Sequence, residues 1–532
     1  MRKRLAIVAG MIAAVAVAGP AFAQKQGGTL KVTHRDNPPS ASIHEEATIS
    51  TIMPFMPVFN NLVVFDPKDK INSPDNIVPD LAESWSWNAD RTKLTFKLRS
   101  GVKWHDGKPF SADDVKCTFD ALIGKDDKTK DLIRKNPRQI WYMNLKETTV
   151  ASPTEVTFTL GRPQPSFLSM LASGYTPVYS CHVDGRAMRS KPIGTGPFKV
   201  VDFKRNESIK LARNADYWKK GLPYLDGIEF KIVPNRSTRV LGFVAGEFDL
   251  TFDSDITFPL LKDVKSQAPN AVCIARPQNV RSNLIVNREK EPFDNPKIRE
   301  ALVLAIDRKP FSEILAQGND LIGAAMQPLP AGVWGMSPDE LAKLPGYGPD
   351  TAKNVAEAQK IMQGLGYGPD KPLKVKVATR NIAIYRDPAV ILIDQLKKIY
   401  IDGELDPIDT TVWFTRVQQK NYQIGLNLTG AGVDDPDVMF FENFYSTSSR
   451  NYTGYSNPEV DKLIVQQSSE ADKAKRMKLV AEIETILTKD AARPTILHNV
   501  ANTCMQPFVK GLTLQDNSIY NGWRFESVWL DK

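Results

Sequence analysis

The sequence has 532 residues, of which 42% are hydrophobic and 24% charged, so it can bury large cores and form two or three domains. The formal net charge is +8, but lysine and arginine are scattered rather than gathered in blocks, which argues against a nucleic-acid-binding protein. After the N-terminal segment, no stretch approaches the roughly 20 apolar residues of a membrane span.

The N-terminal segment has the pattern of a secretory signal peptide. Positive residues 2–4 precede an apolar run of about 14 residues, and an A-x-A cleavage motif ends at Ala23. We therefore expect cleavage after Ala23, a mature chain that begins at Gln24 and a periplasmic location. An exported chain can form disulfides, and the sequence leaves open how four cysteines pair: Cys117, Cys181, Cys273 and Cys504.

Strand-like and helical patterns alternate along the rest of the chain. Alternating apolar residues predict strands over 93–99, 155–160, 227–233, 373–379 and 422–428. Helical periodicity predicts helices over 295–307, 388–400 and 458–487. The pentapeptide GYGPD occurs twice and predicts two turns around one helix, with Asp350 or Thr351 as N-cap and Gly364 as its end. Mixed strands and helices in this order indicate α/β domains.

Motifs that would support catalysis or a metal site are missing from the sequence. There is no G-x-S-x-G elbow and no H-E-x-x-H pair among the five histidines, and no spacing suits zinc. The glycines at 194–197 form G-x-G-P, in which proline removes a donor that a phosphate loop would need. Ser111 and Asp114 form a capping box that opens a helix. We therefore expect no enzyme, no catalytic residue, no cofactor and no metal.

Several longer motifs stand in one order over nearly the whole chain after the signal segment. They are FKLRSGVKWHDGKPFSADDVKCTFDAL, KPIGTGPFKV followed by LARNADYWKKGLPYLDGIEFKIV, EPFDNPKIREALVLAIDR and SNPEVDKLI. Together they resemble the family 5 extracellular solute-binding proteins of ABC transporters, a group with dipeptide, oligopeptide, opine and nickel-chelate receptors. The set in this order, behind a signal peptide, is far more specific than any single motif.

The resemblance implies a fold of the type II periplasmic-binding-protein kind, with two lobes, a hinge and an inserted third domain. We expect domain I (lobe 1) to comprise 24–60, 190–275 and 491–532. Domain II, the insertion, should span 61–189, and domain III (lobe 2) should span 276–490. In this family the ligand lies between domains I and III, which close around it by a hinge motion.

The stretch TGAGVDDPDVMFF, with three aspartates around one proline, departs from the pattern of the family's peptide receptors. Those receptors carry an aspartate for the peptide ammonium three residues before the acid of the (D/E)-P pair, and that position here is Gly432. Asp434 lies two residues later and is the candidate to replace it. Asp435 and Asp437 are expected to form a turn with a helix N-cap rather than a catalytic pair.

Other site residues follow from the same resemblance. Arg380 matches the arginine that holds a peptide carboxylate, a task that suits a guanidinium fork, and Trp413 matches a tryptophan that packs over the ligand. The alternatives are a surface arginine and a core tryptophan. The further ligand-binding candidates, taken from near these positions and from the N-terminal border of the cleft, are Tyr385, Arg386, Arg416, His44 and Glu45.

These observations predict a periplasmic receptor, expected to be a monomer, that binds a small organic solute and delivers it to an inner-membrane ABC permease and ATPase. Because Gly432 replaces the amine anchor, a non-peptide anion is favoured over a di- or oligopeptide, and a metal chelate is a further alternative. A chemosensory receptor on the same fold stays open. A secreted hydrolase would need a nucleophile or metal site that the sequence lacks.

Overall fold

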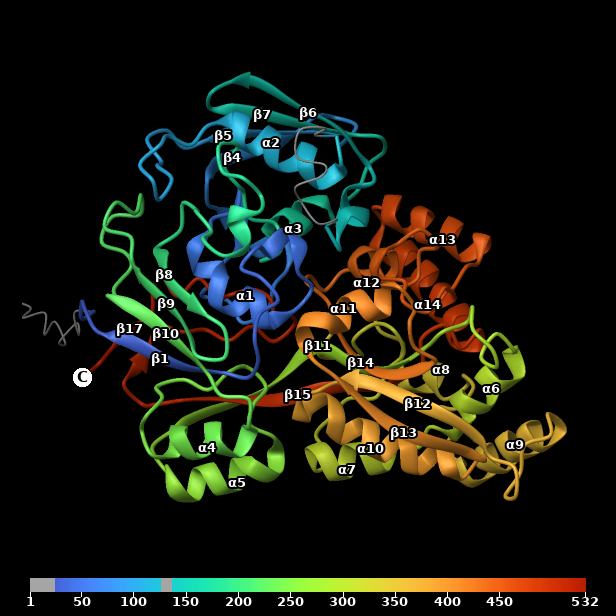
Figure 1. Cartoon of the computed structure of the whole chain (residues 1–532). Coiled ribbons are helices and arrows are strands. Elements are labelled where there is room, and N and C mark those ends of the chain that lie inside the picture. The colour runs from blue at the N-terminus through green and yellow to red at the C-terminus, as the bar shows by residue number, and fades with distance from the viewer. Residues whose placement is uncertain (1–23, 126–135) are drawn as a thin grey trace, which may run out of the picture.

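The computed structural model describes residues 24–125 and 136–532 (Figure 1). The expected signal peptide and its cleavage site lie outside these residues. Within them, no helix has the length and apolar character needed to cross a membrane. Three main sheets organise the chain, and we refer to the regions built around them as lobe I, the inserted domain and lobe III.

Lobe I is built on a four-stranded sheet at the left of Figure 1, in which the N-terminal strand runs parallel to a strand nearly 200 residues later. The strands, in spatial order, are β1 (Thr29–His34), β10 (Gly227–Ile232), β9 (Ser208–Arg213) and β8 (Phe198–Lys204). The remaining elements of lobe I are α1 (Ile49–Phe55), α4 (Arg236–Val244), α5 (Phe258–Gln267), β16 (Val509–Lys510) and β17 (Trp529–Leu530).

The inserted domain carries an antiparallel sheet at the top of Figure 1. Its elements are β4 (Ala82–Trp87), β5 (Lys93–Leu98), β7 (Glu155–Leu160), β6 (Leu145–Ser152), α2 (Ala112–Ile123) and α3 (Phe167–Ala172). A small ribbon of β2 (Val63–Phe65) and β3 (Ile77–Pro79) precedes it. The apolar residues of β5 and β7 alternate and point into the core, as their sequence pattern predicted.

Lobe III contains a five-stranded mixed sheet with helices packed around it. The strands are β13 (Ile401–Ile408), β12 (Leu373–Arg380), β14 (Ile424–Gly430), β11 (Val272–Val286) and β15 (Thr495–Met505). The helices are α6 (Pro296–Ala305), α7 (Arg308–Ala316), α8 (Pro338–Leu341), α9 (Thr351–Gly364), α10 (Ala383–Lys397), α11 (Thr410–Gln418), α12 (Pro436–Asn443), α13 (Pro458–Ser469) and α14 (Lys473–Lys489).

Most of the helix ends follow the predicted capping chemistry. Ser111 and Asp114 form a complete capping box at the start of α2, and the Asp350 side chain caps α9. Asp435 caps α12 by accepting the backbone N–H of Asp437. The helix predicted over 458–487 is two helices, α13 and α14, because the chain breaks at Glu470 and restarts with Asp472 as a new N-cap.

Two long strands, β11 and β15, connect lobe I to lobe III. They pair antiparallel from Val272 and Met505 at the lobe I end to Asn283 and Thr495 at the lobe III end, with a break in register between Pro277 and Arg281. Single bridges through Leu250 join this ribbon to β1. The domain boundaries expected at 275/276 and 490/491 therefore fall within β11 and just before β15.

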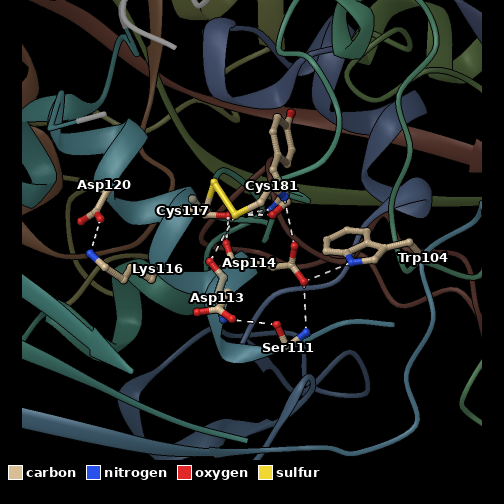
Figure 2. Close-up of a disulfide and its surroundings, with 10 residues drawn as sticks. Trp104, Ser111, Asp113, Asp114, Lys116, Cys117, Asp120 and Cys181 are labelled. Carbon is tan, nitrogen blue, oxygen red and sulfur yellow. Dashed lines mark hydrogen bonds and ion pairs between the residues drawn. A yellow bond between two sulfur atoms is a disulfide. The ribbon is translucent and has the colours of Figure 1, made fainter. Parts of the chain in front are cut away.

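The four cysteines form two disulfides, Cys117–Cys181 and Cys273–Cys504. The first joins α2 to the segment that leaves the inserted domain, as Figure 2 shows. Beside it, the Asp114 carboxylate accepts hydrogen bonds from the backbone N–H of Ser111 and Cys181 and from the Trp104 indole. The capping carboxylate therefore also fastens the disulfide segment to the helix.

Candidate functional site

Arg380 ends strand β12 and reaches from lobe III to the segment that follows β1 of lobe I. Its Nη2 donates to Asp36 Oδ2 at 2.8 Å, and its Nη1 donates to the Tyr385 hydroxyl at 2.8 Å. Its Nε and Nη2 also donate to Thr410 Oγ1. Only 1% of Arg380 is exposed. The predicted carboxylate anchor is thus buried between the lobes and paired with a carboxylate of the protein itself.

A second arginine stands beside the same carboxylate. Arg35 Nε lies 3.8 Å from Asp36 Oδ1 without a hydrogen bond, and its guanidinium packs over Phe252 at 4.8 Å. Asp36 also accepts from Ser50 and Thr410, each at 2.6 Å. We call Arg35, Asp36 and Arg380 the first arginine cluster. It carries two buried guanidinium groups and one carboxylate, which leaves a formal charge of +1.

The same arrangement recurs where the inserted domain meets lobe III. Glu442 of α12 lies 3.3 Å from Arg138 Nε and 2.6 Å from Arg450 Nε, and each of the three residues is at least 96% buried. Several N–H groups of Arg138 and Arg450 have no hydrogen-bond acceptor among the described residues. We call these residues the second arginine cluster; it too has a formal charge of +1.

Aromatic rings connect the two clusters. Arg138 lies over the Tyr175 ring, with 3.2 Å from its Cζ to the ring centre, and Tyr175 packs on Tyr520 with the ring centres 4.7 Å apart. Burial raises the pKa of Tyr520, and Arg138, Arg450 and Tyr385 all act on it electrostatically. We call the buried side chains of Arg380, Tyr385, Tyr520, Tyr175 and Arg138 the lining; they are related in turn by the contacts above and, between Tyr385 and Tyr520, by an electrostatic effect.

Gly432 lies against this lining. A Cβ atom built on it would stand 2.9 Å from Trp141 Cη2, 3.1 Å from Ser173 Oγ and 3.4 Å from Tyr175 Cδ2. The Gly432 carbonyl accepts hydrogen bonds from Ser518 and Asn521 of lobe I. The position at which peptide receptors of the family hold an ammonium is therefore crowded by aromatic rings that also contact an arginine.

Asp434 is half-buried, and its carboxyl group accepts hydrogen bonds from the Val333 backbone and from Asn279. Its Oδ1 accepts from Asn279 at 3.4 Å, and its carbonyl accepts from the Trp334 indole at 3.1 Å. Burial, followed by the charge of neighbouring Asp435, raises the pKa of Asp434 to about 7. The side chain is therefore available as a neutral donor or, beside a ligand cation, as an anion.

The other two aspartates of the stretch have structural contacts. Asp435 forms a two-pronged ion pair with Arg476, at 2.6 and 3.0 Å. Asp437 is fully buried and accepts from Gln164 and Ser166 of the inserted domain and from Gln467 and Ser468 of α13. These contacts explain the cluster without catalysis.

His44 and Glu45 have partners in the inserted domain. The His44 ring stacks on Tyr179 with centres 3.9 Å apart, and its Nε2 contacts the Pro177 carbonyl at 2.9 Å. Burial lowers the pKa of His44 to about 3, so the ring is neutral. Glu45 accepts both prongs of the Arg189 guanidinium. Both residues are buried and hold the start of lobe I against the inserted domain.

Three predicted residues lie away from the clusters. The Trp413 ring is fully buried in a small apolar core with Ile408 and Tyr422. The ring beside the Arg380 guanidinium is that of the next residue, Phe414, at 5.5 Å. Arg386 is exposed and donates to Asn381, and Arg416 pairs with Asp406 near the surface.

Sequence reasoning missed Asp36 and the second arginine cluster. Asp36 follows a short N-terminal strand, and nothing in the sequence indicates that it faces a residue 344 positions later. Arg138, Glu442 and Arg450 come from separate segments whose contact depends on how the inserted domain packs on lobe III. The sequence signal that the surroundings of position 432 differ from those in the family's peptide receptors is the glycine that stands there in place of their aspartate.

The described residues contain no group of three histidine, cysteine, aspartate or glutamate side chains arranged to hold a metal. The histidine rings instead have polar contacts with ordinary partners: His34 with Ser50 and Asp36, His44 with Pro177, His105 with Gly194 and Gly196, His182 with Asp106 and His498 with Ala324. The arrangement suits binding by charge and stacking, and none of these histidines forms part of a nucleophile–base pair.

Comparisons with known proteins show the family of this chain. The family described as bacterial extracellular solute-binding proteins, family 5 Middle, matches residues 76–452. Heme-binding protein A of Haemophilus influenzae is 30% identical over 480 residues, covering 85% of this chain and 84% of that protein. Glutathione-binding protein GsiB of Escherichia coli is 27% identical over 423 residues, covering 77% and 78%.

Among solved structures, the periplasmic binding protein DppA of Helicobacter pylori, in complex with the peptide STSA, has a similar fold. The TM-score is 0.83 at 24% sequence identity, and the alignment covers 96% of this chain and 99% of that one. This likeness confirms the two-lobed, mixed α/β architecture with an additional domain that the sequence motifs implied.

Proposed function

This chain belongs to the bacterial extracellular solute-binding proteins of family 5, and we propose that its solute is a small organic anion held between lobes I and III. Proteins of this family work with an ABC permease and its ATPase and are receptors rather than enzymes. We further propose that the chain is exported with cleavage after Ala23 and that it delivers its solute to an inner-membrane importer.

One observation supports an anionic ligand: in each of the two arginine clusters, two buried arginines share one carboxylate. Burying an unpaired charge costs several kcal/mol, so each surplus guanidinium favours a ligand that brings a negative group. Arginine suits this task because its planar fork binds a carboxylate with two hydrogen bonds. Heme and glutathione, the ligands in the names of two relatives, both carry carboxylates.

Gly432 supports the same ligand class. A side chain at this position would meet Trp141 and Tyr175, and Arg138 lies over both rings. An ammonium placed here would face a guanidinium rather than a carboxylate, and like charges at short range are unfavourable. We therefore favour a non-peptide acid. Arg380 and Tyr385 are the proposed contacts in lobe III, and Arg138 and Tyr175 those on the opposite side.

A di- or oligopeptide is the second candidate, and Asp434 is the observation that favours it. Its half-buried carboxyl group accepts hydrogen bonds from the Val333 backbone and, at 3.4 Å, from Asn279, and its pKa is raised to about 7. A ligand ammonium beside it would lower that pKa and form an ion pair. In that case Asp434 would replace the amine anchor that Gly432 lacks.

Thermal unfolding of the mature chain, freed of co-purified ligand by a denaturing wash, tests the proposal. The panel contains di- and tripeptides, non-peptide carboxylic acids and their uncharged amides. A ligand at a hundred times its dissociation constant adds about 2.7 kcal/mol to the free energy of unfolding, which is visible as a higher Tm. We expect a response to the acids and none to their amides; a response to peptides alone would favour the second candidate. Recovery of the unchanged ligand from the complex checks that no turnover occurs.

A further inference from the structure

Lobe III encloses three arginines that lack a carboxylate partner. They are Arg281 of β11, Arg308 at the start of α7 and Arg493 just before β15, with 1%, 6% and 3% of each residue exposed. Among residues 24–125 and 136–532, no aspartate or glutamate oxygen lies within 4 Å of these guanidinium groups. Other buried arginines do have such partners, as in the 2.6 Å pair of Arg276 with Asp253.

The three side chains line one cavity, whose walls share no residue with the two arginine clusters. The cavity has a volume of about 20 Å³, and its other walls include Tyr347, Phe444 and Thr495. A space of roughly 10–15 Å³ is enough for one water molecule, so the cavity has room for a water-sized species. Its walls are aromatic and aliphatic apart from the guanidinium groups, Thr495 and Thr488.

All hydrogen bonds that these arginines make within the protein go to neutral oxygens. Arg281 donates to Thr495 Oγ1, and Arg308 donates to the carbonyls of Thr495 and Gly346. Arg493 donates to Thr429 and Asn443. Four N–H groups stay without an acceptor among the described residues, namely Nε and Nη2 of Arg281, Nε of Arg308 and Nε of Arg493. Buried N–H groups of this kind normally find a partner.

Two acids act electrostatically on this group without an ion pair: Glu442, which Arg138 and Arg450 share, acts on Arg493, and Glu484 of α14 acts on Arg281. Glu484 does not neutralise the three charges. Its Oε1 accepts from the backbone N–H of Met326 at 2.6 Å, and its Oε2 has no partner among the described residues. Burial raises the pKa of Glu484 to about 8, so the group is mostly protonated at neutral pH. Burial and then the charge of Arg493 lower the pKa of Arg281, but only to about 9, so Arg281 stays charged.

From this geometry we propose that the cavity holds a small monovalent inorganic anion of about the size of chloride. The anion accepts hydrogen bonds from the free N–H groups and offsets the repulsion among the three guanidinium groups. A larger anion, such as sulfate, does not fit the space. The site lies within one lobe, so the anion stabilises lobe III whether or not a solute is bound between the lobes.

Crystals of the mature protein grown in sodium bromide give the direct test, because bromide scatters anomalously and resembles chloride. We expect an anomalous peak within hydrogen-bond distance of Arg281 and Arg493. A cavity that is empty, or that holds only a water without anomalous signal, overturns the proposal. This measurement needs no substitution, so it cannot fail through misfolding of a variant.

A solution test compares Tm in sodium chloride with Tm in sodium gluconate at equal ionic strength, without solute. We expect Tm to be higher in 100 mM chloride by roughly 2 °C or more. Arg281→Gln should lose this difference whatever its absolute Tm. Arg299→Gln is the matched control, because Arg299 is also buried without a carboxylate partner among the described residues but donates to carbonyls outside the cavity. Equal Tm in both salts, or an equal loss of the difference in both variants, overturns the proposal.

Discussion

The Asp36 carboxylate and the Arg380 guanidinium meet at 2.8 Å, although one belongs to lobe I and the other to lobe III. The contact closes the lobes with a group of the protein in the place where a ligand carboxylate is proposed to bind. A solute acid must therefore share Arg380 with Asp36 or displace it. The affinity for the solute then depends on how the ion pairs among Arg35, Asp36, Arg380 and the ligand carboxylate are distributed.

The first prediction concerns Arg380→Ala. We expect it to weaken binding of an acidic solute by roughly 2–5 kcal/mol, because it removes a charged partner from a buried site. It should also lower the stability of the closed form, since Asp36 loses its partner. Calorimetry and denaturant unfolding measure the two effects. The double variant Asp36→Ala/Arg380→Ala should recover stability without recovering affinity; unchanged affinity in Arg380→Ala would exclude the proposed role.

The second prediction concerns Gly432. Alanine here would place its Cβ within 3.0 Å of the rigid Trp141 indole, and such overpacking typically costs about 1–3 kcal/mol. Gly432→Asp adds a negative charge to the same crowded space, so we expect it to bind the native acid more weakly than Gly432→Ala does. Titration of both variants with the same ligand measures the difference. Tighter binding by Gly432→Asp would mean that the ligand carries an ammonium at this point.

The third prediction concerns pH and Asp434. Its pKa rises from 3.8 to about 7 on folding, so between these values the folded state holds a proton that the unfolded state has released. This group therefore makes the protein less stable as pH rises from about 4 to 7, with no further effect above. The variant Asp434→Asn lacks this titrating carboxyl group. Its free energy of unfolding, compared with that of the parent, should therefore increase between about pH 4 and 7 and then level off. Denaturant unfolding at several pH values checks this, with exposed Asp339→Asn as the control.

The fourth prediction concerns the disulfide between Cys117 and Cys181. It spans 64 residues, and a cross-link of that length stabilises by up to about 4 kcal/mol through the unfolded chain. Cys117→Ala/Cys181→Ala should therefore unfold at lower denaturant concentration. Its solute affinity should be unchanged, because the bond joins α2 to a segment of the same inserted domain. If the variant is fully folded but binds the solute more weakly, the inserted domain positions the second arginine cluster.

Local features could be predicted from the sequence because they depend on neighbours. The capping box of Ser111 and Asp114, the N-cap Asp435 and the alternating strands β5 and β7 all required only a few adjacent residues. The two-lobed fold was predicted from the resemblance to the family, which rested on the order of the motifs. The prediction of a single helix over 458–487 was wrong because Glu470 has an extended rather than a helical backbone. Tertiary packing can override helix propensity at such a position.

The site was less predictable, since its residues meet across lobes. Arg380 was predicted by resemblance and Tyr385 because it lies nearby in the sequence; the two do contact each other, but Asp36 was not foreseen. Trp413 and Phe414 are adjacent on α11, and only the packing of that helix decides which ring faces the core and which faces Arg380. A family motif locates the helix but does not settle its rotation.

The pairing of β11 with β15 also affects the order in which the protein can fold. Cys273 and Cys504 face each other in this ribbon, yet 231 positions separate them. A growing chain therefore finishes β11 long before its partner exists, and contacts at such separation form late because a long loop must first be closed. A chain truncated before Thr495 would keep most elements of both lobes but lack one of the two strands that join them.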